Sequence, residues 1–196
     1  RTYVINIVII TYIFALSIAQ GGAILIGHLV GMKKINAAYT IGKRIMRMGT
    51  TTSVTLALLT AIFGKHLLGL LTSDPWIIST GAAILWIEVL LENGRALNFF
   101  GVNSLRSAGD IYFPVIVGII VMWGIQVVGS YILGITFGWG LIAMWAVFAL
   151  DENIRGLIFL RRWNSFKWVG KASWATNNIA TTNIRTYYTP TKIRMN

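Results

Sequence analysis

Thr2–Met32 has the sequence TYVINIVIITYIFALSIAQGGAILIGHLVGM, which contains no Asp, Glu, Lys or Arg. A second stretch, Ile111–Leu150, is free of these residues over 40 positions. About 18 or more apolar residues in a row are long enough to cross a bilayer as a helix. Only 12% of the 196 residues are charged, whereas a soluble domain typically carries about 25%. With a mean hydropathy of +0.69, the sequence predicts a polytopic membrane protein and excludes the soluble enzymes.

The apolar runs and the turn residues between them predict five transmembrane helices. In lipid only a helix or a closed barrel satisfies the backbone, and these runs lack the apolar–polar alternation of barrel strands. The predicted spans cover about residues 3–30, 48–71, 77–105, 113–135 and 141–160. We therefore expect an all-α integral membrane fold, with 1–168 as one transmembrane unit and 169–196 as a polar, basic tail without ordered structure.

The net charge of +11 comes from two clusters of basic residues. One is Lys33, Lys34, Lys43, Arg44 and Arg47, and the other lies in residues 161–196; neither region contains an acid. Lys and Arg gather on the cytoplasmic side of membrane helices, so the clusters need no nucleic-acid partner. We predict a multi-pass protein of the plasma membrane with both clusters and the C-terminus in the cytoplasm, where the tail contacts anionic lipid headgroups.

Three ionisable residues lie inside the predicted span 77–105: Glu88, Glu92 and Arg95. A charge near the bilayer centre costs about 2.5–3.5 kcal/mol on insertion scales, so such residues are paired, face a cavity or have a function. Their spacing of four and three places them on one helical face, which Asn98 extends. Because loss of water favours the neutral form of a carboxyl group, the carboxylates can exchange a proton or Na⁺ for a cationic solute. A structural ion pair between Glu92 and Arg95 is the alternative.

The predicted span 141–160 contains a second group, Asp151, Glu152 and Arg155. Asp151 and Arg155 are four residues apart and can neutralise one another, whereas Glu152 projects about 100 degrees away from Asp151. Arg155 is also close enough to the cytoplasmic end to extend its guanidinium toward water. We favour a structural ion pair or a cytoplasmic gate here over a direct ion site.

Five short motifs resemble one family of transporters. In chain order they are GHLVG at 27–31 with AAY at 37–39, LTSDP at 71–75, ENGRALN at 92–98, LRSAGD at 105–110 with FP at 113–114, and DE at 151–152 with RG at 155–156. They resemble segments of the multidrug and toxic compound extrusion (MATE) transporters, in the same order, from the end of helix eight to helix twelve. One departure is Asn93, which stands where the helix-ten segment has proline.

The resemblance implies a protein of twelve helices in two six-helix lobes, of which this chain would supply helices eight to twelve. It further implies export of organic cations and drugs against an inward Na⁺ or H⁺ gradient, by alternation of the lobes in a monomeric transporter. Glu92 is the residue that the resemblance assigns to coupling, and to metal binding where the ion is Na⁺. Beyond that ion no cofactor and no enzymatic activity are implied. The implied partners are organic cations, membrane lipids and the N-terminal lobe.

Two other functions remain open from the sequence. One is a lipid-linked oligosaccharide flippase of the same superfamily, which needs a cationic cavity for pyrophosphate. The roughly balanced charges within the membrane, with Glu88 and Glu92 deepest, disfavour it. The other is an accessory membrane subunit or a truncated, non-functional remnant.

Overall fold

A computed structural model describes residues 2–172, which form helices and connecting turns and, within this range, no strand. The α-helices are α1 (Thr2–Gly31), α2 (Ile35–Ile62), α3 (Gly64–Gly69), α4 (Pro75–Ser107), α5 (Tyr112–Val121) and α6 (Gly140–Asn164). The segments Met122–Val127 and Ser130–Thr136 continue α5 with the wider turns of a π-helix. A single 3₁₀ turn, Val169–Lys171, follows α6.

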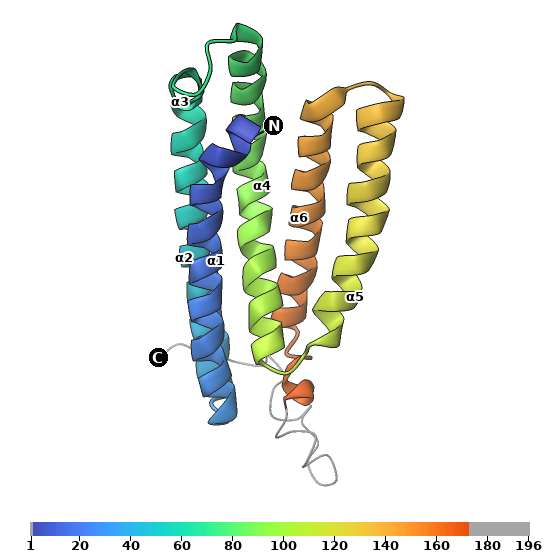
Figure 1. The fold of residues 1–196 in the computed structure, drawn as a ribbon. Helices are drawn as coiled ribbons and strands as arrows, with labels where there is room; N and C mark the ends of the chain where they lie inside the picture. Colours follow the sequence, from blue (N-terminus) through green and yellow to red (C-terminus); the bar gives the residue numbers. More distant parts are fainter. Residues whose placement is uncertain (1, 173–196) are drawn as a thin grey trace.

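Helix α4 lies at the centre of the bundle and packs against α1 and α2 on one side and α6 on the other. Its 33 residues give a length of about 50 Å, which exceeds the hydrocarbon core of about 30 Å. Figure 1 shows α5 beyond α6, at the edge of the bundle. Consecutive long helices run in opposite directions, so the connections alternate between the two ends of the bundle.

Four helices in the described range are long and apolar enough to cross a membrane: α1, α2, α4 and the rod Tyr112–Thr136. Helix α6 has 25 residues, but Asp151, Glu152 and Arg155 lie inside its apolar part. It nevertheless runs between α4 and α5 in the same bundle (Figure 1). The expected all-α membrane fold is confirmed.

The second predicted span differs from the structure at both of its ends. Helix α2 begins at Ile35 and not near residue 48, because buried Ile35, Ala38 and Gly42 pack in the core although basic residues precede and follow them. The helix then ends at Ile62, and α3 forms a separate turn of helix where the prediction continued to residue 71. Much of the first basic cluster therefore lies on a helix and not in a loop.

The start of α4 is fixed by a side-chain cap. Asp74 is the N-cap, and its Oδ1 accepts hydrogen bonds from the backbone N–H groups of Trp76 (2.9 Å) and Ile77 (3.3 Å). Pro75 occupies the first turn, where a backbone N–H would have no acceptor within the helix, so the missing N–H of proline costs no hydrogen bond. The helix continues without a break through Asn93, so the replacement of the family's proline leaves α4 regular there.

The packed unit extends past residue 168. Trp163 and Trp168 stack with ring centroids 4.4 Å apart, and Val169 and Ala172 are buried in the same core. Gly109, with a φ of +95°, approaches the backbone of Lys171, and a Cβ there would lie 2.6 Å from the Lys171 carbonyl oxygen. Residues 169–172 therefore pack with the helices, unlike the tail that was expected from 169 on; the remainder of the expected tail lies outside the described residues.

Candidate functional site between α4 and α6

Glu88 and Glu92, on adjacent turns of α4, have only 1% and 0% of their surface exposed. Arg95 donates to both carboxylates: its Nη1 lies 2.9 Å from Glu88 Oε1 and also bonds to Glu92 Oε1. Two carboxylates therefore share one guanidinium, which leaves one negative charge when all three groups are ionised. The structure brings the three predicted side chains together, while their role in ion coupling stays a prediction.

Glu88 has a second donor that the sequence analysis missed. The indole Nε1 of Trp145, on α6, lies 2.6 Å from Glu88 Oε2. Trp145 is itself 6% exposed, so both oxygens of the Glu88 carboxylate are hydrogen-bonded away from bulk water. This hydrogen bond connects Glu88 of α4 to α6.

The second group of charges, on α6, forms a similar cluster. Arg155 donates from Nη2 to Asp151 Oδ2 and, at 3.1 Å, to Glu152 Oε1. The Arg155 side chain is only 15% exposed. The prediction that its guanidinium extends toward water is therefore wrong. Two acceptors on its own helix hold the guanidinium inside the bundle. Here too, two carboxylates share one guanidinium.

Amide side chains connect the two clusters across the helix interface. Asn98 Nδ2 lies 2.6 Å from Glu152 Oε2, which links the predicted extension of the α4 face to the α6 cluster. Asn93 Nδ2 donates to Asn153 Oδ1 at 3.0 Å, and Asn153 Nδ2 donates to the carbonyl oxygen of Leu90 at 2.8 Å. The sequence analysis did not single out Asn153, because a polar residue beside two acids on a helix gives no signal of its own.

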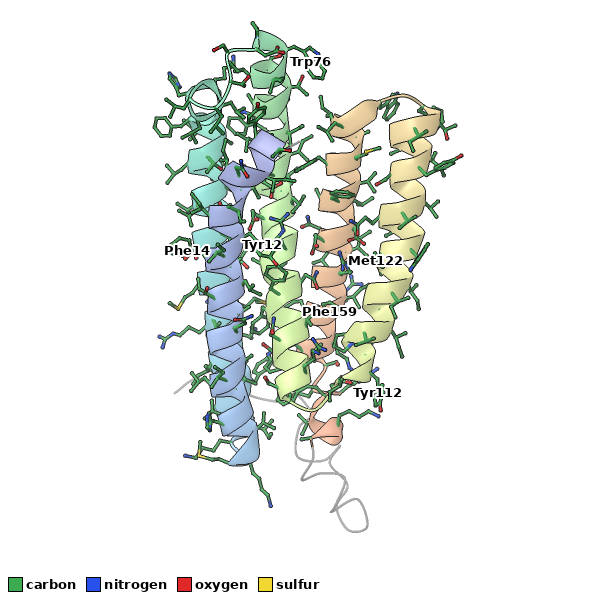
Figure 2. All side chains as sticks on the ribbon, in the orientation of Figure 1. Tyr12, Phe14, Trp76, Tyr112, Met122 and Phe159 are labelled. Atoms are coloured by element: carbon green, nitrogen blue, oxygen red, sulfur yellow. The ribbon has the colours of Figure 1, made fainter. Side chains whose placement is uncertain are left out.

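Arg95 also contacts α1. Its guanidinium carbon lies 5.8 Å from the centre of the Tyr12 ring, a cation–π distance, and Tyr12 meets Phe99 of α4 edge-on at 5.4 Å. Figure 2 shows Tyr12 on the side of α1 that borders α4. The α4 cluster is thus enclosed by aromatic rings from α1 and α6.

Three buried oxygen atoms of the network have no hydrogen-bond partner among residues 2–172: Glu92 Oε2, Asn98 Oδ1 and Asp151 Oδ1. An unpaired buried oxygen is costly, and it is the kind of atom that a proton or a hard monovalent cation satisfies. No three His, Cys, Asp or Glu side chains in this range gather as a transition-metal centre would require. Glu92 Oε2 and Asp151 Oδ1 therefore leave an acceptor position unused on the buried carboxylates of the network.

Replacing Trp145 with Phe tests the bond to Glu88. Trp145→Phe leaves Glu88 Oε2 buried without its donor, and such an orphaned acceptor costs about 1–3 kcal/mol. Trp163→Phe is the matched control, because it removes the same ring atoms but its Nε1 has no partner in the described structure. We expect the free energy of unfolding in detergent, followed by circular dichroism, to fall further for Trp145→Phe by this amount. Equal losses in the two variants would contradict the assignment.

Comparison with known proteins identifies similar chains. Residues 2–132 match the model of the MatE family. The chain is 39% identical over 171 residues to the "Uncharacterized transporter YisQ" of Bacillus subtilis (strain 168), a match that covers 87% of this chain and 38% of the relative. It is 26% identical over 172 residues to the "Probable multidrug resistance protein NorM" of Thermotoga maritima, covering 86% of this chain and 36% of that protein.

A NorM protein of Neisseria meningitidis serogroup B (strain ATCC BAA-335 / MC58) is 22% identical over 148 residues, covering 76% of this chain and 32% of that protein. It too is named a probable multidrug resistance protein. Across the three relatives the chain spans between 32% and 38% of their length.

Proposed function

The chain belongs to the MatE family of multi-pass membrane transporters, and we propose that it forms part of a cation-coupled antiporter that exports organic cations and drugs. The family match covers residues 2–132. The names of the NorM relatives support the choice of drugs as cargo. The proposed complete transporter contains a further lobe, works as a monomer and lies in the plasma membrane, with the basic ends of α2 and α6 and the C-terminus in the cytoplasm.

The observation that carries this proposal is the buried carboxylate of Glu92. It is fully buried, shares Arg95 with Glu88, and keeps one oxygen without a hydrogen-bond partner in the described structure. The α4 cluster has one uncompensated negative charge, which a single H⁺ or Na⁺ would neutralise. A site of this kind can bind a monovalent cation from one side of the membrane and release it on the other.

In the proposed cycle, cation binding at Glu92 weakens its attraction for Arg95. Arg95 then shifts its interaction toward Glu88 and the Tyr12 ring, which changes how α4 packs against α1. Asn98, Glu152 and Arg155 transmit the change to α6, the role that a gate would have. This favours one arrangement of the lobes and releases the organic cation, and loss of the coupling ion restores the capturing state.

The charge of the network supports a cationic cargo over a flippase cargo. Four carboxylates, those of Glu88, Glu92, Asp151 and Glu152, face two guanidinium groups in the described network. The network therefore has an excess of negative charge, whereas the sequence predicted a rough balance. A lipid-linked pyrophosphate would require the opposite sign.

The test is export of a fluorescent organic cation by a YisQ chimera, in which this chain replaces the matched region of YisQ. Cells that make the chimera are loaded with the dye, and the proton and sodium gradients are collapsed separately. We expect export that stops when one of the two gradients is removed, which also identifies the coupling ion. Export that persists without either gradient, or no export by a correctly inserted chimera under conditions where YisQ exports, contradicts the proposal.

A further inference from the structure

The first turns of α2 carry a basic groove that the transport site does not use. Lys43, Arg44 and Arg47 follow Thr40 at spacings of three, four and seven, so they lie along one face of the helix. They border a groove of about 640 Å³, lined by Tyr39, Thr40, Lys43, Arg44, Arg47 and Met48. The volume falls within the range of about 300–1,000 Å³ found for small-molecule sites.

Among residues 2–172, the three cations of this groove form no ion pair. In the described part of the chain, the ion pairs are formed by Arg95, Arg155 and Arg162, and none includes Lys43, Arg44 or Arg47. Asp110, an acid at the same end of the bundle, is engaged by Arg162 at 2.7 Å. Three positive charges therefore converge on one groove without an anion from these residues to balance them.

The wall of the groove is held in place by α6. The Tyr39 hydroxyl donates to Asn164 Oδ1 at 3.2 Å, and its ring packs on Phe166 with centroids 4.5 Å apart. Lys43 Nζ lies 5.3 Å from the centre of the same ring, a cation–π contact that directs the ammonium along the groove. A ligand in the groove would thus reinforce the contact between α2 and the end of α6.

The groove lies at a membrane–water boundary. Residues 48–64 of the chain contain no charge, and 17 residues of helix have a length of about 25 Å, close to the thickness of the hydrocarbon core. Arg47 immediately precedes this stretch. Beyond it, the same face of α2 is an exposed, uncharged track: Met48, Leu59 and Ile62 are exposed by 58%, 48% and 60%, and Thr51 and Thr55 lie between Met48 and Leu59.

From these contacts we infer that the Tyr39–Arg47 groove binds the phosphate headgroup of an anionic phospholipid, whose acyl chains lie along the exposed, uncharged track of α2. The three cations complement the negative charge of the phosphate. The adjoining track accommodates acyl chains, which a soluble phosphate lacks. Anionic lipids are attracted to Lys and Arg clusters at the membrane surface. The bound lipid would hold α2 to α6 at the end that we propose faces the cytoplasm.

The test uses the purified 196-residue chain in detergent with added phosphatidylglycerol or phosphatidylcholine. Native mass spectrometry measures the retained lipid, and thermal unfolding measures the stabilisation that a ligand of the folded state produces. We expect phosphatidylglycerol to be retained over phosphatidylcholine and to raise the unfolding temperature. The variant Lys43→Gln/Arg44→Gln/Arg47→Gln should bind phosphatidylglycerol at least about tenfold more weakly.

The matched control is Lys34→Gln/Arg161→Gln/Lys167→Gln, which removes the same charge from exposed positions at the same end. It should retain phosphatidylglycerol like the unchanged chain. Equal loss in both triple variants, or no loss in either, would overturn the site, and so would displacement of the lipid by excess inorganic phosphate. Arg44→Gln and Arg47→Gln, made singly, repeat the test if the triple variant loses helicity. None of these readouts depends on transport, so the site and the proposed function stand or fall separately.

Discussion

In the YisQ chimera, Glu92→Gln is expected to abolish gradient-driven export while the protein still inserts into the membrane. Glutamine has the shape of a protonated glutamate but neither gains nor loses a charge, so the α4 cluster is fixed in its neutral state. The Glu92 side chain is fully buried, so bulk water does not reach it to replace the lost carboxylate. Dye export with each gradient intact, together with the amount of protein in the membrane fraction, measures the effect.

The control for this variant is Asp74→Asn. It makes the same chemical change on the same helix, but at the exposed N-cap of α4. Asparagine caps a helix about as well as aspartate, so export should remain near that of the unchanged chimera. Export by Glu92→Gln that matches the control would show that Glu92 has no part in coupling.

A second variant separates coupling from a purely structural ion pair. If the cluster serves only as a structural ion pair, the triple change Glu88→Gln/Glu92→Gln/Arg95→Gln removes all three charges, leaves none of them unpaired, and should recover export. If Glu92 binds the coupling ion, the triple variant stays inactive, because the group that takes up the cation is still absent. Recovery of export in the triple variant would therefore contradict the coupling role.

The α4 cluster was predictable from the sequence because it lies on one helix. Glu88, Glu92 and Arg95 are separated by four and three residues, and helical geometry alone brings such side chains together. The start of α4 was predictable for the same reason, since Asp74 and Pro75 act on the turn that directly follows them. The first and fourth spans followed from uncharged runs too long for any soluble element, whereas the spans 77–105 and 141–160 contain charges.

The partners of the cluster were not predictable, because they lie on another helix. Trp145 is 57 residues from Glu88, and Glu152 is 54 residues from Asn98. The spacing of residues within a helix does not predict which other helix packs against a given face, or at which position along the axis the two helices contact each other. The early start of α2 has a different cause: hydropathy marks only the part of a helix that lies in lipid, while Ile35 and Ala38 pack in the core before that part begins.

The close approach of α4 and α6 predicts that Gly94→Ala destabilises the chain strongly. Gly94 lies against the backbone of α6: an added Cβ would overlap the backbone nitrogen of Asn153 and lie 2.7 Å from the carbonyl carbon of Glu152. Gly156, on the facing helix, is equally confined, since its Cβ would lie 3.0 Å from the Gly94 carbonyl oxygen. Backbone atoms cannot rotate away as a side chain can, so the two helices must separate.

We expect Gly94→Ala to lower the free energy of unfolding by about 1–3 kcal/mol, the usual range for an overpacked core. Gly118→Ala on α5 is the matched control, because nothing lies within 4 Å of its Cβ position. Alanine is favoured over glycine in a helix by about 0.5–1 kcal/mol, so the control should be neutral or stabilising. The two changes thus have opposite expected signs although they add the same methyl group. Unfolding of the purified chain in detergent measures both. A Gly94→Ala variant as stable as Gly118→Ala would contradict the backbone contact on which the Asn98–Glu152 and Asn93–Asn153 hydrogen bonds depend.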